Sequence, residues 1–478
     1  MKQFLDYYRC PEEYAALAAE GSSDGASGYF RFGPDVVCFG RPDSSHCSAE
    51  FSAKLKDVAE EIRMGGGVCR LPFKLEEVVE NLRRERYVNG IPKDAFTRGM
   101  LHAIQGAYSF FRPLMPFGLR KQIHRMYFRH WEAIPFPNWP VDRTVDKIFE
   151  RLLACLLQTS QASAIPFIWF WPDGLSSGAI MTHDVEAARG LEFCSQLMDL
   201  DDRWGIKSSF QIVPEGRYEV TRSLLESIRA RGFEVNVHDL NHDGELFKER
   251  KEFLRRADRI NHYVKEYGAR GFRSGVLYRK QDWYDAFEFS YDMSCPSVGH
   301  LEAQRGGCCT VMPFFIGKIL ELPLTTSQDY SLFHILDDYS VDLWRRQIRS
   351  ILEGNGLVSC IVHPDYIIEK RARQAYQGLL EHLTQLRSEG RIWMALPSEV
   401  DLWWRERSRM KLVRAGDSWR IEGPGSQRAK IAWASIEGQR LVYRIEQNAG
   451  VQALAGPGQQ PKAVAAEQPR PISVETPR

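Results

Sequence analysis

The sequence predicts an α/β fold: a distorted (β/α) barrel of seven or eight strands, with an N-terminal α+β region and a small C-terminal β appendage. Apolar segments alternate with amphipathic ones from about residue 178 to residue 405. Short connections join them, which is typical of parallel strands linked by crossover helices. Polar side chains follow several of the apolar segments directly, at the strand ends where α/β folds carry their chemistry.

Length and composition limit the classes of protein that are compatible with this chain. A chain of 478 residues with 44% hydrophobic residues can form two or three domains with a real core. The net charge of +1 argues against a nucleic-acid binder, which usually carries a strong basic excess. Met1–Arg9 has no apolar signal-peptide region, and no apolar stretch reaches the roughly 18 residues of a transmembrane helix. We therefore expect a cytoplasmic protein whose ten cysteines, none in a CxxC pair, are reduced thiols.

The N-terminal region, residues 1–165, is expected to be mixed α and β, and its role is not indicated by any motif. Helical spacing of apolar residues occurs at 74–86, 95–111 and 145–158. Residues 118–131 are basic and aromatic, so this segment could make a peripheral contact with an anionic membrane. We prefer the alternative that its apolar stripe packs on the next domain.

The barrel is expected to occupy residues 166–408. Its strands are predicted at 178–186, 207–214, 233–238, 272–274, near 293, and at 319–322, 357–363 and 392–396. Helices are predicted at 187–204, 218–231 and 245–267, and Gly232 and Gly268 follow the last two as C-caps. Short strands with Gly-rich turns predict a β-rich appendage at 409–447, and the Gly-, Pro- and Gln-rich residues 448–478 are expected to be disordered.

Two acids end the first predicted strand of the barrel. Asp184 and Glu186 are separated by one residue, so on an extended backbone they point to the same side. One can hold a cation while the other transfers a proton. Further along, His238 and His242 follow the strand at 233–238. In a first helical turn these two would share a face and could bind one ion, although paired histidines also occur as exposed or capping residues. Two imidazoles and one carboxylate form a zinc site with room for a water molecule.

Two more polar residues end predicted strands. Arg273, in Gly271-Phe-Arg-Ser-Gly275, can hold a carboxylate in place and keep it ionised. His363 follows the apolar segment that starts at Leu357, and a histidine there can give a proton to a leaving amine. Taken together with the acids and the histidine pair, they predict a metal-dependent hydrolase.

Five segments carry a resemblance to a known family. Thr182-His-Asp-Val-Glu186, His238-Asp-Leu-Asn-His242, Gly271-Phe-Arg-Ser-Gly275, Phe289-Ser-Tyr-Asp-Met-Ser294 and Ile361-Val-His363 stand in the order and approximate spacing of the polysaccharide deacetylases. These are the NodB-homology domains of carbohydrate esterase family four, and the likeness covers roughly residues 175–408. The variations resemble the divergent bacterial branch that is found with exopolysaccharide and glycan-assembly genes.

The resemblance implies a divalent metal, usually zinc, bound by one acid and two histidines. By position, Glu186 looks like the acidic ligand beside His238 and His242, and Asp184 looks like the general base. Because Val185 separates the two acids, their assignments are exchangeable. Arg273 resembles the arginine that orients the base, and His363 resembles the general acid. The backbone N–H near Gly275 or Val276 would help to stabilise the oxyanion.

The function expected from these residues is removal of an N-acyl group, with acetyl the expected group, from an amino sugar. The partner would be an amino-sugar glycan or an activated sugar. Two alternatives remain open at this point. A barrel of the same design could cleave another non-peptide C–N bond, such as a cyclic amide, or the chain could be a non-catalytic glycan-binding or assembly protein.

Overall fold

A computed structural model describes residues 1–19, 26–43, 47–52, 54–91, 126, 128, 130–160 and 162–446. By its internal contacts the chain divides into two units, Met1–Ile445 and Glu446–Arg478, and the structure below is that of the first unit. The predicted helix at 95–111, most of the basic and aromatic segment at 118–131, and the predicted disorder of 448–478 lie outside the described residues.

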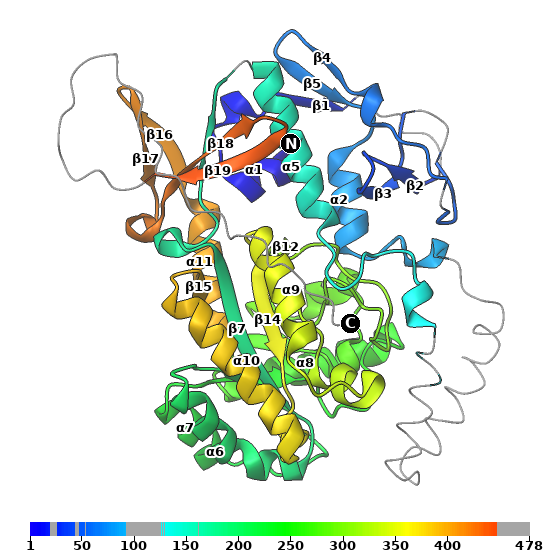
Figure 1. The fold of residues 1–478 in the computed structure, drawn as a ribbon. Helices are drawn as coiled ribbons and strands as arrows, with labels where there is room; N and C mark the ends of the chain where they lie inside the picture. The colour runs from blue at the N-terminus through cyan, green and yellow to red at the C-terminus, as the bar shows by residue number, and fades with distance from the viewer. Residues whose placement is uncertain are drawn as a thin grey trace, which may run out of the picture. The chain divides into compact units, whose positions relative to one another are not determined.

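The largest sheet of the described residues contains nine strands and forms the barrel (Figure 1). Along its main path the order is β12-β13-β11-β10-β9-β8-β7-β14, and β15 also pairs with β7. All of these pairs are parallel except β12 with β13. The strands are β7 Ser177–Val185, β8 Ser209–Ile212, β9 Glu234–His238, β10 Gly271–Arg273, β11 Tyr291–Asp292, β12 Phe314–Ile316, β13 Ile319–Glu321, β14 Leu357–Ile361 and β15 Ile392–Met394.

The segment after β13 brings the two ends of this sheet together. The N–H of Leu324 donates to the carbonyl of Cys295, just after β11, and the N–H of Thr326 donates to the carbonyl of Ser359 in β14. Since β14 pairs with β7 in turn, the sheet curls round on itself. The predicted distorted (β/α) barrel is therefore confirmed.

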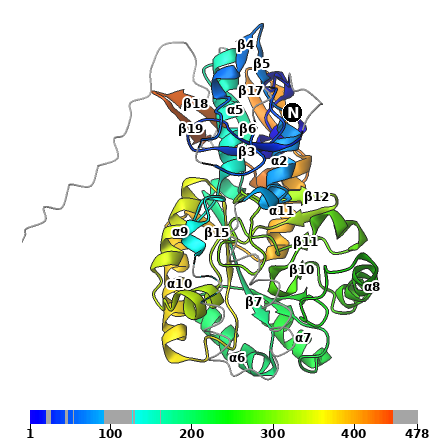
Figure 2. The same cartoon turned by 90° about the vertical axis from the view of Figure 1, so that its right-hand side faces the viewer.

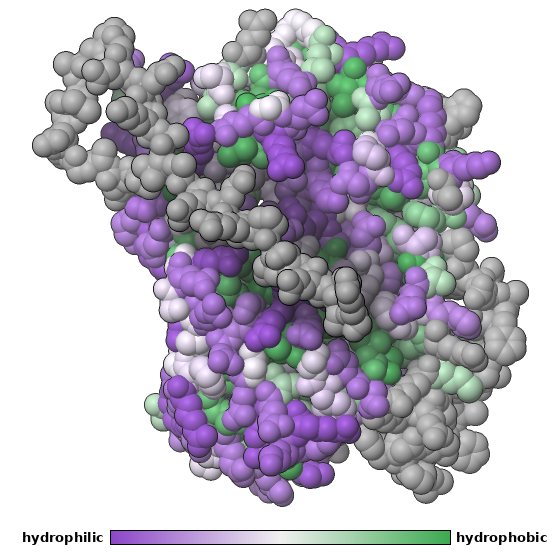
Figure 3. All heavy atoms as spheres, viewed as in Figure 1, coloured by the Kyte–Doolittle hydropathy of each residue, from purple (hydrophilic) through white to green (hydrophobic). Residues whose placement is uncertain are grey.

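Helices surround the barrel sheet (Figure 2). They are α6 Ala188–Arg203, α7 Arg222–Ala230, α8 Arg250–Glu266, α9 Asp342–Glu353, α10 Lys370–Ser388 and α11 Pro397–Arg409. Every residue of β7 is buried, because helices and sheet cover both of its faces. The helices are amphipathic, and hydrophilic residues cover most of the face shown in Figure 3. Helix α7 begins later than predicted because the Thr221 hydroxyl caps it by accepting from the N–H of Leu224.

The remaining strands form small sheets beside the long helix α5 Thr144–Ser160. The order is β1-β5-β4 in one sheet and β19-β18-β6 in another, and two hairpins, β2-β3 and β16-β17, complete the set. The bounds are α1 Lys2–Tyr8, β1 Leu17–Ala19, β2 Gly28–Arg31, β3 Val37–Gly40, β4 Arg63–Gly65, β5 Val68–Leu71, α2 Leu75–Arg83, β6 Ile165–Ile168, β16 Lys411–Ala415, β17 Ser418–Glu422, β18 Ile431–Glu437 and β19 Arg440–Ile445.

The C-terminal strands share a core with the N-terminal region. Strand β18 pairs with β6, with Ile431 opposite Ile168. Arg407 of α11 is buried and donates to the backbone carbonyls of Ile168, Trp169 and Tyr7. Elements from both ends of the chain thus stabilise each other, while the boundaries at 165/166 and 408/409 stay predictions. Among the described residues, none of the helices combines the length and the hydropathy that crossing a bilayer requires.

Candidate metal centre at the strand ends of the barrel

Strand β7 delivers three polar side chains at its carboxyl end. His183 points into the core, where its ring nitrogens lie 3.0 Å from Oδ2 of Asp201 in α6 and 3.0 Å from the carbonyl of Val362. Asp184 and Glu186 leave the strand on the other side, as the alternation of side chains predicts. Asp184 is buried, whereas the side chain of Glu186 is 26% exposed. The second acid is therefore accessible to solvent and to a ligand.

His238 and His242 converge, although the predicted helical turn between them is wrong. Helix α8 begins only at Arg250, and both Asp239 and His242 have φ of +55°, in the left-handed region. The Asp239 side chain accepts from the N–H of Leu240, which stabilises this tight loop. The loop turns His242 back toward His238, so that their ring centroids lie 4.9 Å apart. Backbone strain of this kind concentrates at functional sites.

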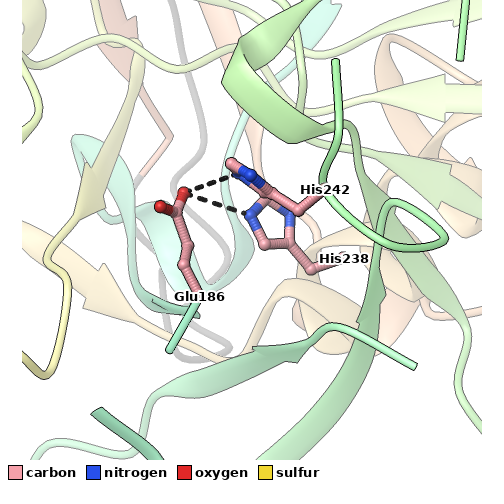
Figure 4. A group of neighbouring side chains, drawn as sticks. All are labelled: Glu186, His238 and His242. Carbon is pink, nitrogen blue, oxygen red and sulfur yellow. Dashed lines mark hydrogen bonds and ion pairs between the residues drawn. The ribbon is translucent and has the colours of Figure 1, made fainter. Parts of the chain in front are cut away.

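The rings of His238 and His242 both face the carboxylate of Glu186, which is partly exposed (Figure 4). Oε1 of Glu186 lies 2.8 Å from Nε2 of His242 and 3.5 Å from Nε2 of His238. One potential ligand atom from each of the three residues lies within 4.8 Å of the other two. Burial raises the pKa of Glu186, but His242 and His363 outweigh it and hold the pKa well below its ordinary value. The acid is thus ionised, as a metal ligand must be.

The ring nitrogens of His238 are oriented for a ligand role. Its Nδ1 lies 3.0 Å from the backbone carbonyl of Arg273, which fixes the proton on Nδ1 and leaves the lone pair of Nε2 toward Glu186. The Nε2 atom of His242 is buried and, among the described residues, has no partner with hydrogen-bond geometry. An acid and two imidazoles whose Nε2 atoms both face its carboxylate fit a divalent metal such as zinc.

Gly275 permits the close approach of the loop that carries the histidines. A Cβ atom at this position would collide with the Asp239 carboxylate and lie 3.1 Å from Cδ2 of His242. The next residue, Val276, has φ of +58°, which is strained for a β-branched side chain. The residues near the predicted oxyanion donor are therefore held in an unusual backbone conformation directly beside the histidine pair.

Asp184 is held by a buried guanidinium. Nη1 of Arg273 donates to Oδ1 of Asp184 at 2.7 Å and to Oγ1 of Thr182 at 2.8 Å, and Nε donates to the carbonyl of Met293. Burial raises the pKa of Asp184, but Arg273, His238 and His363 outweigh it, so the pKa lies below its ordinary value. The other oxygen, Oδ2, is 3.8 Å from Nε2 of His238. Asp184 is thus an ionised, oriented carboxylate next to the cluster of Glu186, His238 and His242.

His363 completes the cluster through a partner that the sequence analysis missed. Its Nε2 lies 3.4 Å from Oε1 of Glu186, while Nδ1 lies 2.6 Å from Oδ1 of Asp329. Oδ2 of Asp329 accepts the backbone N–H of His363 at 2.8 Å, so the carboxylate orients both the ring and the main chain. Burial lowers the pKa of His363, but Asp329 and Glu186 outweigh it and raise the pKa well above its ordinary value. Asp329 stands in the helical turn directly before the helical segment Ser331–Leu336, where no motif marks it in the sequence.

All six residues predicted for the site are brought together by the fold: Asp184, Glu186, His238, His242, Arg273 and His363. Aromatic rings adjoin them on one side. The ring of Tyr366 lies 4.7 Å from that of His363, and it also contacts His334 at 4.8 Å. The cluster thus combines three residues that could hold a metal ion, a carboxylate held by arginine and a histidine held by an acid.

Comparison with known proteins finds similarity at the level of solved structures. No protein-family model and no curated protein matches the chain. A putative polysaccharide deacetylase from Mycobacterium smegmatis is 17% identical over 52% of this chain and 98% of its own, with a TM-score of 0.42. A probable polysaccharide deacetylase from Pseudomonas aeruginosa PAO1 is 13% identical over 49% and 93%, with a TM-score of 0.37. The Puue allantoinase is 12% identical over 49% and 92%, with a TM-score of 0.38.

The family named in the first two of these structures is the one that the five sequence motifs resemble, the polysaccharide deacetylases. In each of the three comparisons the matched region is about half of this chain. What the site does is argued below from its own side chains.

Proposed function

We propose that this protein is a metal-dependent hydrolase that removes an N-acyl group, with acetyl the expected one, from an amino sugar in a glycan or glycan precursor. The observation that carries the proposal is the convergence of Glu186, His238 and His242 on one point beside Asp184 and His363. Hydrolysis of an amide needs a base for the attacking water and an acid for the leaving nitrogen, and this cluster offers one of each.

Glu186, His238 and His242 are the residues that would hold the metal. A divalent ion held there would make a water molecule more acidic and would polarise the amide carbonyl. Glu186 is proposed as the acidic ligand because its oxygen lies nearest to both imidazoles, whereas Asp184 is engaged by Arg273. The geometry therefore favours one of the two assignments that the sequence left exchangeable.

The chain's own residues perform the proton transfers. Asp184 takes a proton from the attacking water, and the buried Arg273 keeps its carboxylate ionised and pointed at the site. His363 then gives a proton to the departing nitrogen, and Asp329 fixes the ring that does so. A backbone N–H near Gly275 or Val276 is the proposed donor to the oxyanion.

Purified protein tests the proposal when metal content and acetate release are measured together. We expect about one zinc per chain and acetate release from N-acetylglucosamine oligomers. Chelation should abolish the reaction and zinc should restore it. His242→Ala should lose both metal and activity, and Asp184→Asn should keep the metal while the reaction slows at least about 100-fold. Glu381→Gln, on the exposed face of α10, is the matched control.

Other results would distinguish this function from the two alternatives, a different C–N hydrolase and a non-catalytic glycan-binding or assembly protein. If His238→Ala or His242→Ala lost the metal but kept full activity, the proposed mechanism would be wrong. Cleavage of a cyclic amide in preference to the acetylated sugar would identify a different C–N hydrolase. A wild-type protein with neither metal nor activity would point to a glycan-binding or assembly protein. A cytoplasmic location stays a prediction, and comparison of cell fractions tests it.

A further inference from the structure

The segment between β8 and α7 contacts both parts of the chain that supply the candidate metal ligands. Its two contact residues, Arg217 and Tyr218, are neighbours in the sequence. Arg217 donates to the loop that carries His242. The Tyr218 hydroxyl donates to the peptide group that leads from Val185 to Glu186. One short segment therefore contacts the end of β7 and the loop after β9 at the same time.

The guanidinium of Arg217 holds the peptide groups on both sides of His242. Its Nε donates to the carbonyl of Asn241 at 3.1 Å, and its Nη2 donates to the carbonyl of His242 itself. These two carbonyls flank the Cα atom of His242, whose φ is +55°. A non-glycine residue in this left-handed region is strained and keeps its conformation only where its surroundings hold it. Nη2 also lies 3.4 Å from Nδ1 of the ring, which is longer than an ordinary hydrogen bond, so the backbone contacts are the stronger ones.

No carboxylate competes for the Arg217 guanidinium within the part of the chain that the structure describes. The acids that lie nearby in the sequence have other partners. Glu215 pairs with Arg259 at 2.5 Å, and Asp243 pairs with Arg256 at 2.7 Å. The charge of Arg217 is therefore directed at the backbone of the loop that carries the histidine.

The Tyr218 hydroxyl holds the segment that carries the acidic ligand. It donates to the carbonyl of Val185 at 2.5 Å and accepts from the N–H of Val213 at 2.9 Å. The ring packs against the core of the barrel, which fixes its position. Because the carbonyl of Val185 and the N–H of Glu186 belong to one planar peptide group, a bond to this carbonyl orients the backbone from which the Glu186 side chain projects.

The segments stay joined without these two side chains. The N–H of Glu215 donates to the carbonyl of Leu240 at 3.0 Å, a contact between main-chain atoms only. Strand β8 also pairs with β9 along its length. Removal of the Arg217 guanidinium or the Tyr218 hydroxyl should therefore loosen the ligand segments without unfolding the barrel.

We propose that Arg217 and Tyr218 are positioning residues that together set the separation of His242 and Glu186 in the metal-free protein. The inference rests on the metal centre of the proposed function and adds to it two residues that contact only the backbone around the ligands. Groups that orient metal ligands contribute to affinity, and their loss typically weakens metal binding about 10- to 100-fold.

Zinc binding to the full chain, measured by competition with a chelating dye, tests the proposal without any hydrolysis. Arg217→Ala and Tyr218→Phe should each raise the zinc Kd at least about tenfold. Arg217→Lys keeps the charge but not the planar fork that contacts two carbonyls, so its zinc Kd should fall between those of Arg217→Ala and wild type. Arg222→Ala, which removes an exposed arginine at the start of α7, is the matched control and should bind zinc as wild type does.

Two further measurements separate positioning from a general loss of structure. Urea unfolding of the metal-free chains should give nearly the same midpoint for Arg217→Ala, Tyr218→Phe, Arg222→Ala and wild type. Visible absorption of the Co²⁺-loaded chain depends on the arrangement of the ligands around the ion. Its bands should shift in Arg217→Ala and in Tyr218→Phe and stay unchanged in Arg222→Ala.

An unchanged zinc Kd in Arg217→Ala or in Tyr218→Phe would overturn the inference. A weaker affinity with unchanged Co²⁺ bands would also overturn it, as would a wild-type chain that binds no zinc. Zinc binding that depends on both residues in a chain without hydrolytic activity would support the inference and count against the proposed function. Acetate release by a chain whose Arg217→Ala variant binds zinc as wild type does would have the opposite meaning, so the two failures are distinguishable.

Discussion

Glu302 gives the barrel a dependence of stability on pH that one substitution should remove. Its side chain is buried, and Oε2 accepts a hydrogen bond from Gln328. Burial raises the pKa of Glu302 to about 7, although Arg279, Gln328 and His363 oppose the rise. The folded protein therefore binds a proton that the unfolded chain releases at its ordinary pKa of 4.5. Glu302→Gln removes the titration and keeps an acceptor for Gln328.

The size of the effect follows from linkage. Stability falls with pH wherever the folded state binds more protons, which here means the window between 4.5 and about 7. The contribution is fully present below that window and is lost as the pH rises through it. At about 1.4 kcal/mol for each pH unit, the whole window corresponds to about 3 kcal/mol. Glu302→Gln should thus be about 3 kcal/mol more stable than wild type at pH 8 and within about 1 kcal/mol of it at pH 5.

Urea unfolding monitored by tryptophan fluorescence at pH 5, 6, 7 and 8 measures this difference. Glu381→Gln, which neutralises an exposed glutamate of α10, is the control and should follow the wild-type curve at every pH. The same stability difference between Glu302→Gln and wild type at pH 5 and pH 8 would refute the reasoning, because it would mean that Glu302 does not titrate in this window.

Three other changes have expected outcomes. Asp329→Asn weakens the hold on His363, so zinc content should stay at the wild-type level while kcat for amide hydrolysis falls at least about 100-fold; loss of zinc would contradict this. Glu85→Ala leaves the buried guanidinium of Arg279 without its carboxylate, and urea unfolding should show a loss of about 3–5 kcal/mol, against less than about 1 kcal/mol for the exposed Glu226→Ala. The fragment 166–408 lacks β18, the partner of β6, and should show no cooperative transition in calorimetry; a sharp transition would mean that the barrel folds alone.

Local patterns predicted the parts of the site that lie on regular strands. The apolar runs ending at Asp184, His238 and His363 mark β7, β9 and β14, and the parallel arrangement brings their ends to one edge. Two residues on an extended strand have fixed relative directions, which is why Asp184 and Glu186 were correctly placed on one side. Strand ends are therefore the part of an active site that periodicity alone can reveal.

The rest of the site depends on irregular backbone and on long-range contacts. The loop from Asp239 to His242 turns through left-handed conformations that no helical or strand pattern describes. Asp329 reaches His363 from a helical turn 34 residues earlier in the chain, and its neighbours Gln328 and Tyr330 carry no recognisable motif. The pairing of β6 with β18 likewise depends on tertiary structure, since both are short apolar segments that could pair with many others.

The pairing of β6 with β18 has a consequence for how the chain is made. Ribosomes release a protein from its N-terminus, so β6 emerges before the barrel strands and β18 emerges after them. Until residue 431 has left the ribosome, one edge of β6 can find no native partner, and an unpaired strand edge invites association with other nascent chains. The barrel is thus synthesised between β6 and β18, and these two strands can pair only after the whole barrel has been made.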